Sequence, residues 1–98
     1  MRVMVKARIP TIEGNAAVAG QTMGQIIQES FGRMKPEAAY FGLENGKRTM
    51  FAVFDLADQS AMIPTLEPMF LRLNAELEVS PVMTAADLEA GFQALAQA

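Results

Sequence analysis

The first residues of the chain alternate strictly between apolar side chains and side chains that are mostly charged. Apolar residues recur at every second position until Pro10, which lacks the backbone N–H that a sheet interior requires. A period of two predicts a β-strand with one buried face, here over residues 2–9. The buried set is Val3, Val5, Ala7 and Ile9, and the other face carries Arg2, Met4, Lys6 and Arg8.

After Pro10 the spacing of apolar residues changes to three or four. Asn15 follows a turn-like Glu-Gly pair and is placed to cap a helix, which we predict over residues 16–34. The residue before a proline is pushed out of the helical region, so the helix should end at Lys35, before Pro36. Its apolar stripe consists of Met23, Ile26, Ile27, Phe31 and Met34.

Two apolar segments, 37–44 and 47–56, flank the dipeptide Asn45-Gly46. Both of these residues tolerate the positive φ of a type I′ turn, so the pattern predicts a tight β-hairpin. A two-residue loop also fixes the register and therefore the faces. One face carries Tyr40, Phe51 and Val53, with Tyr40 opposite Phe51, and the other carries Phe41, Leu43, Met50 and Phe54.

The rest of the chain predicts a helix, a strand and a last helix. Asp58 is placed to cap the next helix, and we expect a short turn at residues 60–63 and then a helix that runs to Leu73 and closes at Asn74. Alternation resumes over residues 75–83, which predicts a fourth strand. A capping box at Thr84 and Asp87 opens the last helix. Its apolar stripe is Leu88, Phe92 and Leu95.

This order, β-α-β-β-α-β with an added helix, predicts a single α+β domain over residues 1–98. Right-handed crossovers place both main helices on one face of a four-stranded antiparallel sheet, in the ferredoxin-like arrangement. Both faces of the predicted hairpin are apolar, and the chain's own helices cover only one of them. We therefore expect two copies to pair through the sheet as a homodimer.

The amino-acid composition limits the ligands and the kinds of catalysis that can be expected of the chain. The formal net charge is −3 with 8 basic residues, so the chain lacks the basic patch that nucleic-acid binding needs. It has neither cysteine nor histidine, which removes the usual metal and haem ligands and the usual general base, and we expect neither metal nor cofactor. The first residues do not resemble a signal peptide and no apolar run would span a membrane, so we expect a cytoplasmic protein without membrane contact.

In its element order, its Asn45-Gly46 hairpin, its two-faced sheet and its added helix, the chain resembles the dimeric α+β-barrel superfamily. Within it, the segments KPEAAY at 35–40, ENGKR at 44–48 and LNAELE at 73–78 are similar to those of small bacterial proteins of about a hundred residues, a likeness that brings no activity with it. The superfamily also includes cofactor-independent monooxygenases, lactone isomerases and haem-degrading enzymes. The resemblance implies an apolar or aromatic ligand in the cleft between helices and sheet, while histidine-dependent activities have no matching residue here.

Two basic residues are candidates for ligand binding. Lys6 and Arg8 share a strand face and could hold a carboxylate ligand at the mouth of the cleft. The alternative interpretation is structural. The first and last strands are neighbours in this topology, so Lys6 and Arg8 could instead pair with Glu76 and Glu78.

Tyr40 and Asp55 are the candidate catalytic residues. The Tyr40 hydroxyl could orient or protonate a substrate, and Phe51 would then line the ligand site beside it. Alternatively, the Tyr40 ring simply stacks on Phe51. Asp55 lies on the same face and could act as a general base if burial raised its pKa, or be an ordinary loop residue.

Three functions remain open from the sequence. The first is a homodimer that binds a small apolar ligand in the helix–sheet cleft. The second is a cofactor-independent monooxygenase or isomerase. The third is an accessory subunit whose sheet pairs with a different protein.

Overall fold

The computed structural model describes residues 1–98 and has an α+β fold with a four-stranded antiparallel sheet, four α-helices and one 3₁₀ turn. The elements are β1 (Arg2–Ile9), α1 (Thr11–Ala19), α2 (Met23–Met34), β2 (Ala38–Glu44), β3 (Lys47–Asp55), η1 (Gln59–Ala61), α3 (Met62–Leu73), β4 (Glu76–Pro81) and α4 (Ala85–Ala96). The four strands lie in the order β2-β3-β1-β4, which is compatible with a ferredoxin-like arrangement.

The hairpin has the turn and the register that the sequence predicts. Asn45 and Gly46 adopt φ values of 52° and 75°, as the two central residues of a type I′ turn require. Tyr40 pairs with Phe51, and Phe41 pairs with Met50. Since side chains alternate along a strand, this register decides which residues share a face throughout β2 and β3.

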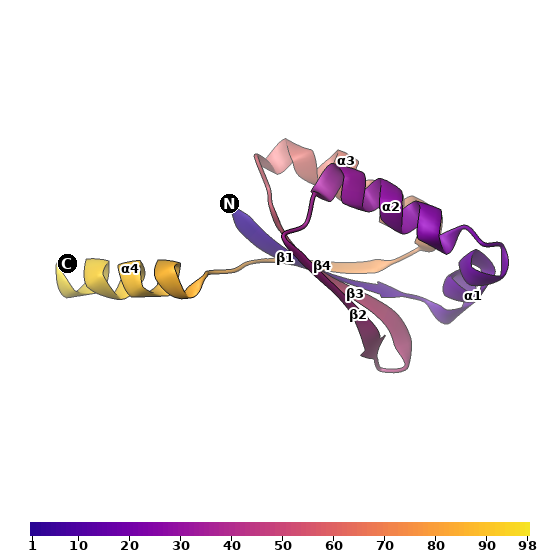
Figure 1. Ribbon diagram of the computed structural model, residues 1–98, viewed down its shortest axis with the longest axis horizontal. Coiled ribbons are helices and arrows are strands. Elements are labelled where there is room, and N and C mark those ends of the chain that lie inside the picture. Colours follow the sequence, from indigo (N-terminus) through magenta and orange to yellow (C-terminus); the bar gives the residue numbers. More distant parts are fainter.

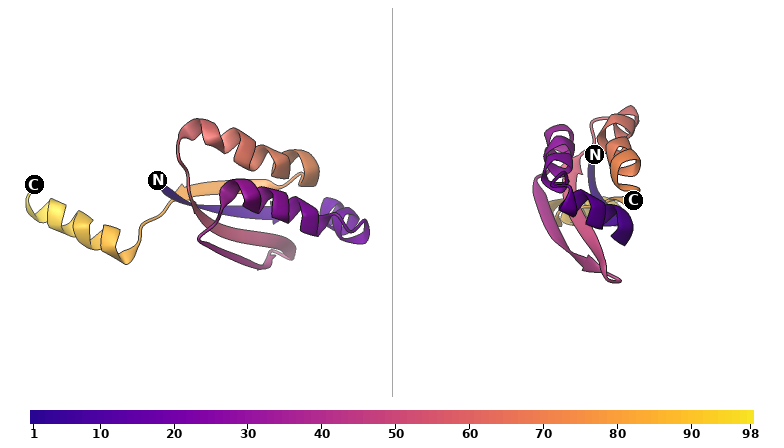
Figure 2. Two further views of the ribbon diagram at one scale, coloured as in Figure 1. Left: turned by 45° about the horizontal axis from the view of Figure 1, so that its top comes forward. Right: turned by 90° about the vertical axis from the view of Figure 1, so that its right-hand side faces the viewer.

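Helices α2 and α3 lie side by side over one face of the sheet (Figure 1; Figure 2). The strand residues beneath them are the alternating apolar set of β1 together with Met50, Ala52 and Phe54 of β3. The Phe41, Met50 and Phe54 face of the hairpin is therefore the face toward the helices. The helices complete the core with Ile26 and Met34 from α2 and Leu66, Met69 and Leu73 from α3.

The predicted single helix over residues 16–34 is wrong. The chain becomes helical at Thr11, directly after Pro10, and Asn15 lies inside α1 rather than at its cap. The helix breaks between Gly20 and Thr22, where Gln21 takes a left-handed φ of 59°, and α2 begins at Met23. Proline is compatible with a helix start because its missing N–H would have no helical partner there.

The predicted capping residues act at three later elements, but Asp58 caps the 3₁₀ turn η1 and not α3, which begins after Ala61 without a side-chain cap. Asp58 accepts a hydrogen bond from the backbone N–H of Ser60 at 2.7 Å and so caps η1. Asn74 closes α3 in the left-handed conformation, with φ 52°. At α4, Thr84 and Asp87 form a reciprocal capping box: the Thr84 Oγ1 accepts from the Asp87 N–H at 3.1 Å, and the Asp87 carboxylate accepts from the Thr84 N–H at 3.0 Å.

Helix α4 projects away from the rest of the domain beyond the end of β4 (Figure 1). The molecule is consequently elongated, with extents of 56 × 28 × 17 Å. The apolar stripe of α4, which consists of Leu88, Phe92 and Leu95, is exposed. An ion pair between Arg2 and Asp87, at 3.6 Å, links the start of α4 to β1. No helix is long and apolar enough to cross a membrane, and the longest have 12 residues.

The face of the sheet away from the helices is only partly apolar, which corrects the expectation of a sheet apolar on both sides. Near the start of β1 it carries an apolar patch, which consists of Met4, Ala38, Tyr40, Phe51 and Val53. Toward the other end of β1, charged side chains cover the strands in a cluster that consists of Lys6, Arg8, Glu44, Lys47, Glu76 and Glu78.

Candidate functional site

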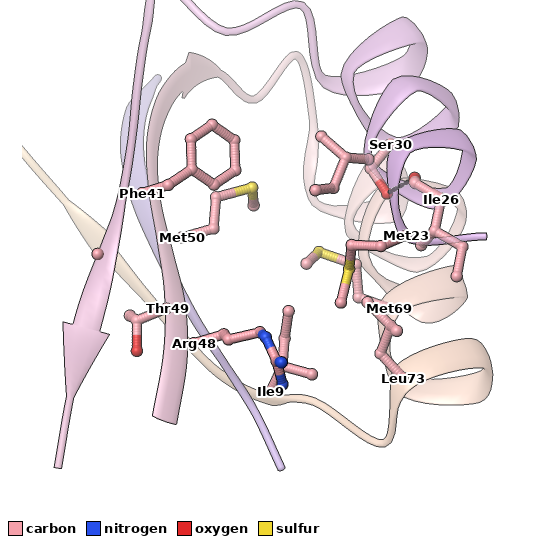
Figure 3. Close-up of a pocket in the computed structure, with 12 residues that line it drawn as sticks. Ile9, Met23, Ile26, Ser30, Phe41, Arg48, Thr49, Met50, Met69 and Leu73 are labelled. Atoms are coloured by element: carbon pink, nitrogen blue, oxygen red, sulfur yellow. Dashed lines mark hydrogen bonds between the residues drawn. The ribbon is translucent and has the colours of Figure 1, made fainter. Parts of the chain in front are cut away.

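A cavity of about 210 Å³ lies between the sheet and helices α2 and α3. Figure 3 shows side chains from both layers surrounding it, with Phe41 and Met50 on the strands opposite Met23 and Met69 on the helices. Its lining is mostly apolar and consists of Ile9, Met23, Ile26, Ile27, Ser30, Phe41, Gly42, Arg48, Thr49, Met50, Met69 and Leu73. An apolar cavity of this kind has few polar groups to hold water, so an apolar ligand can occupy it at little cost.

Strand β2, an edge strand of the sheet, contributes Phe41 and Gly42 to the lining of the cavity. Phe41 remains 58% exposed and Leu43 75% exposed, although both point toward the helix side of the sheet. The rings of Phe31 and Phe41 approach with centroids 6.1 Å apart and so join α2 to β2. Three of the lining residues are methionines, whose unbranched side chains can adjust to different ligand shapes.

Two of the polar residues in the lining have partners of their own. The Ser30 hydroxyl donates to the carbonyl of Ile26 one turn earlier, at 3.0 Å. The Thr49 hydroxyl donates to the carbonyl of Lys47 at 3.0 Å. Both side chains are buried, and these bonds satisfy their donors.

Arg48 is the charged residue of the cavity, and it is held against α1. Its guanidinium donates to the Asn15 side-chain oxygen at 3.1 Å. A Cβ built on Gly14 would lie 2.6 Å from the Arg48 Nη1 and 3.3 Å from an Ile9 methyl, so the absence of a side chain at Gly14 leaves room for the guanidinium. Arg48 forms none of the ion pairs of the structure, and Figure 3 shows its guanidinium beside Ile9.

Arg48 is not among the candidates that the sequence pattern suggests, although the hairpin register contains a signal for it. Arg48 lies opposite Leu43 on the helix-facing side of the hairpin, where Phe41, Met50 and Phe54 are all apolar. A charged residue on an otherwise apolar face is expensive to bury without a partner. Such a residue at the edge of a core is therefore a candidate for ligand contact.

Lys6 and Arg8 lie on the opposite side of the sheet from this cavity, since they alternate with Val5, Ala7 and Ile9. They are engaged in ion pairs. Arg8 contacts Glu44 at 2.5 Å, Glu78 at 2.6 Å and Glu76 at 3.3 Å. Lys6 contacts Glu44 at 3.1 Å and Glu78 at 3.9 Å. The geometry matches the structural interpretation of these two residues rather than a carboxylate site at the cleft mouth.

The ion pairs shift the pKa values of their members. Hydrogen bonds from Lys6, and then from Arg8, lower the pKa of Glu44, although its partial burial acts in the opposite direction. The hydrogen bond from Arg8 is the main cause that lowers the pKa of Glu78. The three glutamates around Arg8 raise its own pKa. These carboxylates surround a guanidinium, and no group of three or more acidic side chains is arranged to hold a metal ion.

Tyr40 and Phe51 also lie on the face away from the cavity. They are opposite each other in the β2–β3 register, as expected, and Tyr40 is 71% exposed. The Tyr40 hydroxyl therefore does not reach a ligand enclosed between helices and sheet.

Asp55 does not have the environment of a general base with a raised pKa. It is exposed, and its carboxylate accepts from the N-terminal ammonium of Met1 at 2.8 Å. That hydrogen bond and the charge behind it lower the pKa of Asp55. Asp55 and Tyr40 thus form no shared site with the cavity.

No family model and no curated protein matches this chain. Among solved structures, it is similar to the de novo designed protein Ferredog-Diesel, with 12% identity over 83% of this chain and 85% of that one, and a TM-score of 0.49. It is also similar to MupZ from Pseudomonas fluorescens, with 17% identity over 97% of this chain and 80% of that one, and a TM-score of 0.44. Similarity at this level assigns neither a family nor an activity to the chain.

Proposed function

We propose that the chain is a ferredoxin-like homodimer of the dimeric α+β-barrel type that binds a small apolar ligand between its helices and its sheet. The observation that carries the ligand-binding part is the cavity of about 210 Å³. An engineered cavity of about 150 Å³ lined by apolar side chains accepts benzene. By that scale, the present cavity suits a ligand whose enclosed part has roughly eight non-hydrogen atoms.

Binding is favoured over catalysis because the candidate catalytic residues are far from an enclosed ligand. Tyr40 is on the other face of the sheet, and Asp55 is exposed and paired with the N-terminus. The Ser30 hydroxyl, which lines the cavity, donates to the carbonyl of Ile26, and Thr49 alternates with Arg48 and Met50, so its side chain lies on the other face of the sheet. An enzyme would need a proton donor or acceptor directed at the ligand.

The methionines of this chain allow a direct test of ligand binding. In protein labelled with ¹³C at the methionine methyl groups, we expect toluene to shift the NMR signals of the three cavity methionines, Met23, Met50 and Met69, because an aromatic ring lies against them. Met4, on the opposite face of the sheet, and Met83, before α4, serve as internal controls and should not shift. Shifts confined to Met4 or Met83, or no saturable shift at all, would contradict binding in the cavity.

The dimer is supported by the surface that the helices leave uncovered. The apolar patch of Met4, Ala38, Tyr40, Phe51 and Val53 lies beside a charge cluster in which each cation contacts carboxylates, so a second copy would meet no large excess of one sign. The exposed stripe of α4 adds apolar surface beyond the same end of the sheet, because Ser80 of β4 pairs with Met4 and Pro81 pairs with Val3. A two-fold axis lets one such surface cover its own copy.

Replacing Tyr40 by lysine should weaken this dimer at least about tenfold, because a two-fold axis places the new ammonium in the apolar patch twice. Tyr40 is 71% exposed, so the fold of the monomer should not depend on it. Leu71→Lys, at a residue of α3 that is 78% exposed, is the matched control and should leave association unchanged. Sedimentation equilibrium of the three proteins measures the effect.

A wild-type chain that sediments as a monomer at micromolar concentration would overturn the homodimer. Equal dissociation constants for the wild type and Tyr40→Lys would place the interface elsewhere on the molecule. If the wild-type chain is a monomer, the third function considered from the sequence, an accessory subunit that pairs with a different protein, would explain the uncovered face of the sheet better than a homodimer.

A further inference from the structure

We infer that the ligand of the cavity is a small apolar monocarboxylate, bound with its hydrocarbon part between helices and sheet and its carboxylate on Arg48. This inference rests on the proposed ligand-binding function and adds the chemical class of the ligand. It comes from the one charged side chain in a lining that is otherwise apolar or already hydrogen-bonded.

The Arg48 guanidinium is held in place but not neutralised. Its position is set by the hydrogen bond to Asn15 and by the close approach that Gly14 permits. The other arginines and lysines of the sheet, Arg2, Lys6, Arg8 and Lys47, all have a carboxylate within 4.0 Å, whereas Arg48 has a neutral amide. A guanidinium has five N–H donors, so the bond to Asn15 leaves enough of them for a bidentate contact with a carboxylate.

The first turn of α2 lies at the same cavity. Met23, the first residue of that helix, lines the cavity, and Thr22 makes no side-chain cap to the helix N-terminus. The free N–H groups of a first turn carry partial positive charge. Together with Arg48, this end of α2 favours an anion over a neutral polar group at the rim of the cavity.

The size of the cavity limits the hydrocarbon part. A volume of about 210 Å³ accommodates roughly eight non-hydrogen atoms on the scale of the benzene cavity, which fits the chain of a medium-length fatty acid or one aromatic ring with a short side chain. The lining contains no cluster of hydrogen-bonding groups that would select a sugar or a nucleotide. A monocarboxylic acid matches both parts of the site, since its carboxylate suits Arg48 and its hydrocarbon part suits the apolar cavity.

Octanoate and 1-octanol test this inference because they share a chain length and differ in charge. We expect the wild type to bind octanoate at least about tenfold more tightly than octanol, as a hydrogen-bonded charge pair contributes that much. Arg48→Met should remove the difference, with octanoate affinity falling about tenfold and octanol affinity changing by less than about threefold. Arg48→Lys, which keeps the charge, should restore part of the octanoate affinity.

Titrations followed by the methionine methyl signals report the site as well as the affinity. Arg33→Met, at an exposed residue of α2 that makes no ion pair, removes the same charge from the protein and should leave both affinities unchanged. Retained octanol binding in Arg48→Met shows that the variant is folded with its cavity intact. Equal binding of octanoate by the wild type and Arg48→Met, or a wild type that does not discriminate, would overturn the carboxylate assignment while ligand binding stands. A wild type that binds neither of these probes nor toluene would overturn the proposed function and the assignment together.

Discussion

Leu73→Ala is expected to lower the free energy of unfolding by about 3 to 5 kcal/mol, a large part of the stability of a domain of this size. Leu73 is the last residue of α3, is 0% exposed and packs in the main core. It also lines the cavity, so the space left by its side chain would merge with a void that already exists. The side chains around Leu73 already border an empty space on one side, so they can move little to fill the additional space and to regain the lost contacts.

The same helix offers a matched control two residues earlier. Leu71 is 78% exposed, and Leu71→Ala should change the free energy of unfolding by less than about 0.5 kcal/mol. Urea denaturation of the three proteins, with the slope of the transition checked for constancy, gives the comparison. A Leu73→Ala variant within about 1 kcal/mol of the wild type would mean that the end of α3 is not packed as the structure has it.

Local chemistry predicted the hairpin and much of the helix capping. The register of β2 and β3 follows from Asn45-Gly46 alone, since a two-residue turn leaves no freedom in the pairing. Asp58 and the Thr84–Asp87 box act through backbone groups only two or three residues away, and Asn74 ends α3 through its own left-handed conformation. Such signals do not depend on the rest of the fold.

The break between α1 and α2 was missed because it has no comparable signal. Gln21 adopts a positive φ without being glycine or asparagine, although the bonds that end α1 there, from the Gln21 N–H to the Val18 carbonyl at 3.1 Å and from the Thr22 N–H to the Ala17 carbonyl at 2.9 Å, are those of a motif that usually has glycine at this position. The start of α1 at Thr11 is not evident from the sequence because Pro10 also marks the end of the first strand. A proline can serve both purposes at a junction between a strand and a helix.

The cavity lay beyond prediction because its walls come from residues far apart in the sequence, such as Ile9, Phe41 and Met69. The register states which residues share a face but not which face the helices cover. The candidates that the sequence suggests, Lys6, Arg8, Tyr40 and Phe51, therefore lie on the face away from the helices, whereas Arg48 lies on the covered face.

Arg8→Met is expected to be strongly destabilising at neutral pH and progressively less so in acid. Arg8 is 18% exposed at the side chain and contacts carboxylates on two different strands, Glu44 on β2 and Glu76 and Glu78 on β4. Removing it leaves Lys6 facing Glu44 and Glu78 and leaves Lys47 as the cation beside Glu76. Carboxylates that shared a guanidinium would then repel one another across the sheet.

The pH dependence follows from the direction of the pKa shifts. In the wild type, the folded-state pKa values of Glu44 and Glu78 lie below the ordinary 4.5, so their contribution to stability is present above about pH 4.5 and is lost as the pH falls through the folded values. Without Arg8, the pKa of Glu78 loses the main cause of its lowering, whereas Glu44 keeps its bond from Lys6. The difference in the free energy of unfolding between Arg8→Met and the wild type should thus become smaller as the pH is lowered from 7 through this window.

Urea unfolding of both proteins at several pH values, and ¹³C titration of the glutamate carboxyls, measure these effects separately. The titration should show a larger upward shift of the pKa for Glu78 than for Glu44 in Arg8→Met. Arg33→Met removes an exposed cation that makes no ion pair, and its stability should follow the wild-type curve at every pH. The prediction would be contradicted if the free energies of unfolding of Arg8→Met and the wild type changed in parallel with pH and both glutamate pKa values stayed the same. Water and salt would then already screen the three contacts of Arg8, and the packing of its aliphatic stem would account for any stability that is lost.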